Sequence, residues 1–166
     1  GIEEIRKAVG YTYYLSADAA SQFWSFALYE DSRDILAVRA PLGLLRFTRM
    51  PFGCLAAPMI AQGCYRLMLE NLGKQAEQEG ELSAFKTAAD MRQRCSAFQD
   101  DFLFGAHAEL ELLDLLQAVL TLCQEYNVTL NPAKCRVGFE EEAFFGFMVN
   151  KKESRPSEKN LNPLTS

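Results

Sequence analysis

Two adjacent aspartates, Asp100 and Asp101, stand between short apolar stretches and most limit how this chain can fold. The stretch 102–106 reads as a returning strand, which places the acidic pair at or near the bend of a hairpin. A lone Asp18 ends an earlier strand over 11–17. In isolation, an Asp pair is also common in ordinary solvated turns. If the fold brings the three carboxylates together, they are better suited to bind a pair of Mg²⁺ ions than to be buried in a hydrophobic core. Such a pair of ions is the catalytic centre of a nucleotidyl transferase.

Length and charge set bounds on this interpretation. The chain has 166 residues, 49% of them hydrophobic, which is enough for one packed core but short for a polymerase of several domains. Its 17 Lys and Arg residues against 22 Asp and Glu residues give a net charge of −5. A protein that holds a phosphate backbone usually carries a basic face. We therefore expect this chain alone to bind nucleic acid poorly.

Cysteine usage and hydropathy bear on location. The five cysteines form no CxxC pair and no zinc-binding spacing with the only histidine, His107. An odd number of cysteines without a secretory leader predicts reduced thiols inside the cell, in the cytoplasm, the nucleus or an organelle. No apolar run approaches the ~18 to 20 residues of a membrane span, so we expect no membrane partner.

Hydrophobic periodicity divides the chain into helices and strands. It predicts helices at 2–10, 59–72, 82–94 and 110–126. It predicts strands at 11–17, 23–28, 35–40, 44–49 and 102–106, and a closing hairpin within 139–150. The strands 23–28 and 35–40 would pair across the polar turn 30–34. The leucine-rich helix 110–126 is expected to cover a sheet as core packing, with an interaction zipper as the weaker alternative.

From residue 14 onwards, ordered blocks of the chain resemble the reverse transcriptase domain of gypsy-type LTR retrotransposons. The blocks are Tyr14-Leu15-Ser16-Ala17-Asp18, Met50-Pro51-Phe52-Gly53 with Pro58 and Gln62, Phe98-Gln99-Asp100-Asp101, Leu130-Asn131-Pro132-Ala133-Lys134 and Phe144-Phe145-Gly146-Phe147. Any one block is a weak signal, but all of them in the family's order are a strong one. The resemblance implies an α/β (α+β) fold, a reverse transcriptase palm whose antiparallel sheet is backed by helices, with incomplete fingers and no thumb.

The resemblance also implies roles for single residues in the chemistry. Asp18, Asp100 and Asp101 would be the catalytic metal ligands for two Mg²⁺ ions, with Mn²⁺ as a possible substitute. Lys134 would neutralise or protonate the leaving pyrophosphate, and a lone surface lysine is its alternative.

Other matched positions would bind substrate. Phe23 matches an aromatic residue that excludes a 2′ hydroxyl, although a core phenylalanine is an equally good interpretation. Phe52 and Gly53 match residues that line the nucleotide pocket, where glycine lets backbone approach the substrate. Contacts to template and primer are implied for Gln62, Phe98, Phe145 and Gly146.

The chain departs from the family pattern between Gln62 and Asp100, which are 38 positions apart. This separation is longer than in the family and predicts an insertion at about 73–95. The expected organisation is a palm with partial fingers over 1–150, followed by a polar tail over 151–166 that leads towards a missing thumb.

Two functions remain open from the sequence. The first is a fragment of an RNA-directed DNA polymerase, weak or inactive on its own, with a dNTP and an RNA or DNA template-primer as partners. The alternative is a domesticated or degenerate palm that serves as a non-catalytic structural or interaction subunit and binds other proteins. The three carboxylates favour the enzyme. The net acidity and the missing fingers and thumb favour the subunit.

Overall fold

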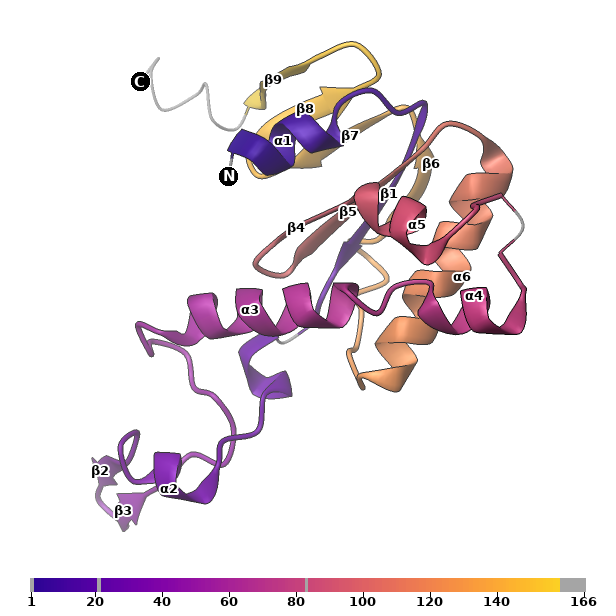
Figure 1. Ribbon diagram of the computed structural model, residues 1–166. Helices are drawn as coiled ribbons and strands as arrows, with labels where there is room; N and C mark the ends of the chain where they lie inside the picture. The colour runs from indigo at the N-terminus through magenta and orange to yellow at the C-terminus, as the bar shows by residue number, and fades with distance from the viewer. Residues whose placement is uncertain (1, 21, 83, 159–166) are drawn as a thin grey trace.

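A four-stranded antiparallel sheet forms the centre of the computed structural model, which describes residues 2–20, 22–82 and 84–158 (Figure 1). The strand order is β4-β5-β1-β6. These strands are β1 (Tyr13–Asp18), β4 (Cys95–Phe98), β5 (Asp101–Ala106) and β6 (Arg136–Phe139). The expected antiparallel sheet backed by helices is confirmed.

Helices cover one face of this sheet. They are α3 (Ala57–Leu69), α5 (Ala88–Gln93) and α6 (Glu109–Glu125). Because side chains alternate along a strand, Leu15, Phe102 and Phe104 all point into this layer, where they share one core with Leu115 of α6. Helix α6 buries only part of its leucines, since Leu110, Leu113 and Leu120 stay about half exposed.

A smaller core lies on the opposite face. Helix α1 (Ile2–Ala8) and a three-stranded sheet of β7 (Glu141–Phe144), β8 (Phe147–Asn150) and β9 (Ser154–Pro156) cover it. Tyr14 and Leu103 of the central sheet pack there with Phe144 and Val149. Strand β9 belongs to the stretch expected to be a polar tail, so the ordered sheet continues past residue 150, and residues 159–166 of that tail lie outside the described residues.

The segment 28–49, called the arm below, extends away from the palm (Figure 1). It contains α2 (Glu30–Arg33) and a hairpin of β2 (Val38–Ala40) and β3 (Gly43–Leu45). The predicted pairing of 23–28 with 35–40 is wrong. The stretch before the arm forms the 3₁₀ helix η1 (Gln22–Ser25), because its aromatic side chains Phe23 and Phe26 turn back onto the main core. The stretch predicted as a polar turn, 30–34, forms α2, whose first helical turn carries the acidic residues Glu30 and Asp31.

The described residues of the stretch 73–95, where an insertion is predicted, include two short helices, and the helix predicted over 82–94 is present only as α5. Helix α4 (Lys74–Glu79) precedes α5, whose first turn is capped by Thr87 Oγ1 accepting from the Asp90 amide at 3.2 Å. Phe85 and Met91 are buried in the main core. Among the described helices, none combines the length and hydrophobicity needed to cross a bilayer.

Candidate active site

The predicted acidic residues meet at one end of the central sheet. Asp18, the last residue of β1, is the register partner of Asp101, the first residue of β5. The Ala19 amide donates to the Asp100 carbonyl at 2.9 Å, which ties the chain after β1 to the turn that carries Asp100. Strand alternation directs Asp18 and Asp101 to the same face as Tyr14 and Leu103. The tertiary fold therefore brings the three carboxylates to one corner.

A tight hairpin presents the acidic pair. Phe98 pairs with Asp101, so Gln99 and Asp100 form a two-residue loop. Gln99 has a φ of +53°, the sign that a type II′ hairpin turn requires at its first loop position. Gln62 of α3 donates from Nε2 to the Ala97 carbonyl at 3.1 Å and accepts from the Gln99 amide. The predicted template residue Gln62 thus contacts the hairpin itself.

Lys134 reaches the same corner from the loop after α6. Its Nζ donates to Asp18 Oδ2 at 3.0 Å, although 116 positions separate the two residues. The loop is fixed by the Asn131 amide, which donates to the Asp18 carbonyl at 2.8 Å, and by Asn131 Oδ1, which accepts from the Ala133 amide. Asp18 is 7% exposed, whereas the Lys134 side chain is 61% exposed. The hydrogen bond to Asp18 raises the pKa of Lys134, so the lysine is a firmly charged neighbour of this carboxylate.

The negative charges of Asp18, Asp100 and Asp101 repel one another. Partial burial, followed by the charges of Asp100 and Asp18, raises the pKa of Asp101, and Lys134 opposes that rise. Asp101 is nevertheless an exposed residue. A hollow of about 200 Å³ lies here, lined by Asp18, Asp101, Lys134 and residues of β7.

The donor set suits a divalent cation, because hard ions such as Mg²⁺ bind carboxylate oxygens. Within the described part of the chain, no group of three or more His, Cys, Asp or Glu side chains is close enough together to hold a metal ion. The Asp18 carboxylate instead forms an ion pair with the Lys134 ammonium group. The chemistry of the site fits a metal, and binding one requires these side chains to be drawn closer together.

Glu142 is a fourth acid at this site that the sequence interpretation missed. It is 5% exposed and lines the same hollow. Its Oε2 lies 3.1 Å from Arg136 Nε, an ion pair whose geometry does not make a hydrogen bond. Burial raises its pKa. Strand alternation was the available signal, since Glu142 and the buried Phe144 are two positions apart on β7.

The predicted nucleotide-pocket residues form an aromatic cluster between palm and arm. The rings of Phe23 and Phe52 meet edge to face with centroids 5.4 Å apart, and Trp24 contacts Phe52 at 5.9 Å. Phe52 is 64% exposed. Gly53 has a φ of +86° with open space where a Cβ would lie, so backbone is accessible there. Phe23 also packs against the main core, and its contact with the nucleotide sugar stays a prediction.

The predicted primer-contact residues lie beside the acidic hairpin. Phe98, at the end of β4, contacts Phe145 in the β7–β8 turn with ring centroids 4.0 Å apart. Phe145 and Gly146 both have positive φ, +48° and +77°, which makes the turn tight. The structure therefore joins Phe98, Phe145 and Gly146 in one cluster.

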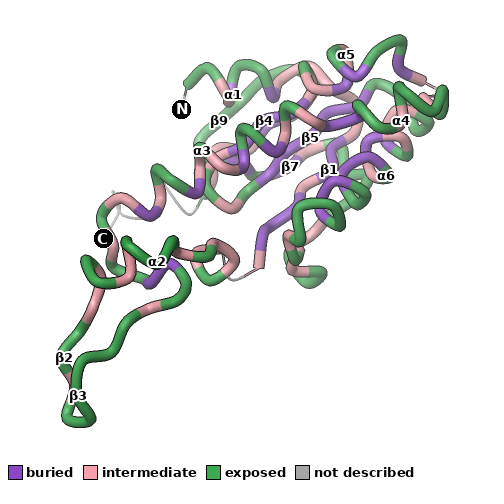
Figure 2. Tube along the Cα trace, turned by 60° about the horizontal axis from the view of Figure 1, so that its bottom comes forward, coloured by how far each residue is buried: buried purple, intermediate pink, exposed green. Residues whose placement is uncertain are grey.

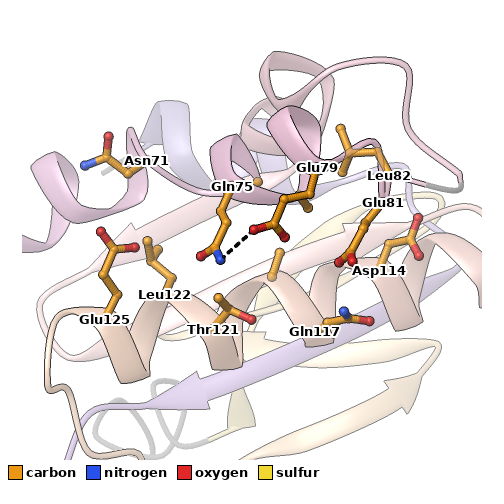
Figure 3. A pocket seen from close by; sticks show the side chains of 13 residues that line it. Asn71, Gln75, Glu79, Glu81, Leu82, Asp114, Gln117, Thr121, Leu122 and Glu125 are labelled. Atoms are coloured by element: carbon orange, nitrogen blue, oxygen red, sulfur yellow. Dashed lines mark hydrogen bonds between the residues drawn. The ribbon is translucent and has the colours of Figure 1, made fainter.

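A separate groove lies between α4 and α6 (Figure 3). Its described lining includes four carboxylates and no Lys or Arg; the carboxylates are Glu79, Glu81, Asp114 and Glu125. Asp114 accepts from the Ala84 amide at 2.7 Å, and Glu79 accepts from Gln75 at 3.1 Å. None of the predicted site residues lines this groove, so it is distinct from the acidic corner.

Comparisons with known sequences agree on one family. A family model described as reverse transcriptase (RNA-dependent DNA polymerase) matches residues 2–153. The retrovirus-related Pol polyprotein from transposon 412 of Drosophila melanogaster is 30% identical over 164 residues, covering 98% of this chain and 12% of that protein. The enzymatic polyprotein of figwort mosaic virus is 25% identical over 142 residues, covering 86% and 18%. The chain thus spans less than a fifth of these relatives.

Solved structures share the fold. The foamy viral protease-reverse transcriptase in complex with double-stranded DNA superposes with a TM-score of 0.78 at 19% identity, over 99% of this chain and 26% of that one. The same viral protein in complex with an RNA/DNA hybrid gives a TM-score of 0.74 at 18% identity, over 98% and 20%. Both likenesses concern the backbone arrangement of the palm and arm.

Proposed function

Because this chain belongs to the reverse transcriptase (RNA-dependent DNA polymerase) family, we propose that it forms the palm and part of the fingers of a polymerase that copies an RNA or DNA template into DNA. The observation that carries the proposal is the corner where Asp18 pairs in register with Asp101, next to Asp100, with Lys134 hydrogen-bonded to Asp18. The retrotransposon and viral polyproteins that resemble the chain support an origin in such a polyprotein.

Transfer of a nucleotide requires neutralised phosphate charge and an in-line approach, and little covalent work by the protein. We propose that Asp18, Asp100 and Asp101 hold two Mg²⁺ ions, for which Mn²⁺ can substitute. These ions would supply charge neutralisation and activate the primer 3′ hydroxyl. Lys134 is exposed and charged, so its ammonium group can turn from Asp18 towards the leaving pyrophosphate and donate a proton there.

Substrate positioning falls to the two aromatic clusters. Phe23, Phe52 and Gly53 would receive the deoxynucleotide, with exposed aromatic surface and accessible backbone for its sugar and base. Phe98, Phe145 and Gly146 would contact the primer end beside the acids. Nucleic acid is the proposed partner, and an intracellular location is consistent with five unpaired cysteines.

A non-catalytic role as a structural subunit is the second candidate. The net charge of −5 and the exposed apolar side chains of the arm favour it, because both suit protein contacts better than phosphate contacts. Protein partners would then cover the arm.

Asp18→Asn distinguishes the two candidates. In the full-length polymerase that carries this chain, we expect it to lower primer extension by roughly 10³-fold, because a metal ligand contributes several kcal/mol to the transition state. The matched control is Asp31→Asn, the same change at an exposed site of the arm. Extension at the wild-type rate by Asp18→Asn would place the chemistry elsewhere, and an inactive wild type that still binds protein partners would support the subunit role.

A further inference from the structure

The loop at the tip of the acidic hairpin, Gln99 and Asp100, lies outside the β4–β5 pairing. Strand β4 has four residues, and the loop at its end contains Gln99 with a φ of +53°. Residues other than glycine adopt this left-handed conformation only at an energetic cost, and they keep it where neighbouring groups hold them. Gln99 immediately precedes the two predicted metal ligands. Any relaxation of Gln99 would therefore move Asp100 first.

Gln62 supplies the missing support from α3. Its side-chain amide donates to the Ala97 carbonyl at 3.1 Å and accepts from the Gln99 amide. The two backbone groups lie two positions apart, on either side of Phe98, so one side chain bridges the last turn of the hairpin. Gln62 is half-buried in a helix of 13 residues, which makes it a fixed point. Both ends of its amide are used by the protein's own backbone.

We propose that Gln62 is a positioning residue that holds the Gln99–Asp100 turn, and with it both adjacent carboxylates, in the geometry that catalysis needs. The proposal rests on the proposed function and assigns Gln62 a role other than contact with the template. On the other side of the turn, the Ala19 amide holds the Asp100 carbonyl at 2.9 Å. The turn is thus contacted from β1 and from α3, and we expect loss of the α3 contact to let Asp100 shift.

The test uses Gln62→Met in the full-length polymerase, a change that keeps the size of the side chain and removes both hydrogen bonds. Gln124→Met is the matched control, since Gln124 is an exposed glutamine on α6. We expect Gln62→Met to lower kcat by about 10- to 100-fold, the cost of a misplaced catalytic group, with an unchanged KM for template-primer. A raised KM for template-primer with unchanged kcat would overturn the proposal in favour of template contact.

Gln99→Gly separates positioning from simple packing. Glycine adopts positive φ without strain, so the turn should need less support. We expect the double variant Gln62→Met with Gln99→Gly to recover a substantial part of the lost kcat. A loss of kcat that Gln99→Gly leaves unchanged would overturn the proposal. If Gln62→Met fails to fold, Gln62→Glu replaces it, because a carboxylate still accepts from the Gln99 amide but cannot donate to Ala97.

Amide hydrogen exchange gives a readout that does not depend on activity. In Gln62→Met we expect the Gln99 amide to exchange about 10-fold faster than in the wild type or in Gln124→Met, because it has lost its acceptor. Equal exchange in all three would overturn the proposal. Should the wild-type polymerase fail to extend a primer, the proposed function fails, and exchange at Gln99 still decides whether Gln62 holds the turn.

Discussion

The β1–β5 pair and the β2–β3 hairpin are both antiparallel, yet they differ in what surrounds them. The first is covered by helices on one face and by α1 with a second sheet on the other, and Tyr14 and Phe104 are fully buried there. The second has three residues per strand, and most of its residues are exposed (Figure 2). Leu42, in the turn between the two strands, is 93% exposed. Two-stranded hairpins are marginal in water, so backbone pairing alone does not stabilise the arm.

The difference shows which residues of this molecule have positions fixed by packing. Residues of the acidic corner are fixed by a sheet whose register is set by burial on both faces. The arm is tied to the palm at its base, where the Met50 amide donates to the Phe26 carbonyl at 3.0 Å and Arg49 donates to the Trp24 and Ser25 carbonyls. We therefore expect the palm to set the chemistry and the arm to gain its order from whatever it contacts.

The largest contrast should come from leucines of the two regions. Leu115 of α6 is fully buried, and Leu42 is 93% exposed. Leu115→Ala should lower the free energy of unfolding by about 2–5 kcal/mol, through lost burial and a new cavity. Leu42→Ala should change it by less than ~0.5 kcal/mol. Urea denaturation measures both, and a Leu42→Ala cost that approaches the Leu115→Ala cost would mean that the arm is packed in solution.

A second contrast uses glycines. A Cβ on Gly105 would lie 2.0 Å from Tyr11 Cδ2, so Gly105→Ala should lower the free energy of unfolding by about 1–3 kcal/mol. Gly43 has a φ of +118° and open space around it, so Gly43→Ala strains the arm alone. Because local opening of the arm relieves that strain, the thermal midpoint of the Gly43→Ala variant should stay near the wild-type value.

The Tyr11 ring should account for the Gly105 effect. Adding Tyr11→Leu to Gly105→Ala ought to recover part of the lost stability in the same thermal scans. No recovery would contradict the steric explanation.

The smallest expected effect concerns pH. Burial raises the pKa of Glu142, so between the usual value of 4.5 and the raised value the folded palm binds more protons than the unfolded chain. The stability contributed by this group is fully present below the unfolded pKa and falls as pH rises through that window. Glu142→Gln should therefore flatten the decline in the free energy of unfolding between acidic and neutral pH.

Glu30→Gln is the control for this pH dependence, since it removes an exposed carboxylate from the arm. Urea titrations at several pH values measure the slopes of all three proteins. A steeper decline in Glu142→Gln than in the wild type would contradict the assigned cause, and would mean that the ion pair with Arg136 outweighs burial.

Local patterns identified the elements that lie close to the acidic corner. The strand before Asp18, the hairpin around Asp100 and Asp101, and the helix that became α6 all follow from periodicity and turn chemistry. Such patterns succeed where an element is buried on a regular face. They failed over 23–40, where aromatic residues on a strand-like pattern pack onto the core from a 3₁₀ helix.

By itself, the sequence determined the family, the strands and helices of the palm, and the residue types of the acidic corner, because each is encoded by neighbouring residues. Only the tertiary structure decided that Lys134 pairs with Asp18, that Glu142 is buried beside them, and that Gln62 braces the turn at Gln99. The Lys134–Asp18 hydrogen bond alone joins residues 116 positions apart. The formation of these contacts depends on how strands and helices pack together, which short-range patterns do not specify.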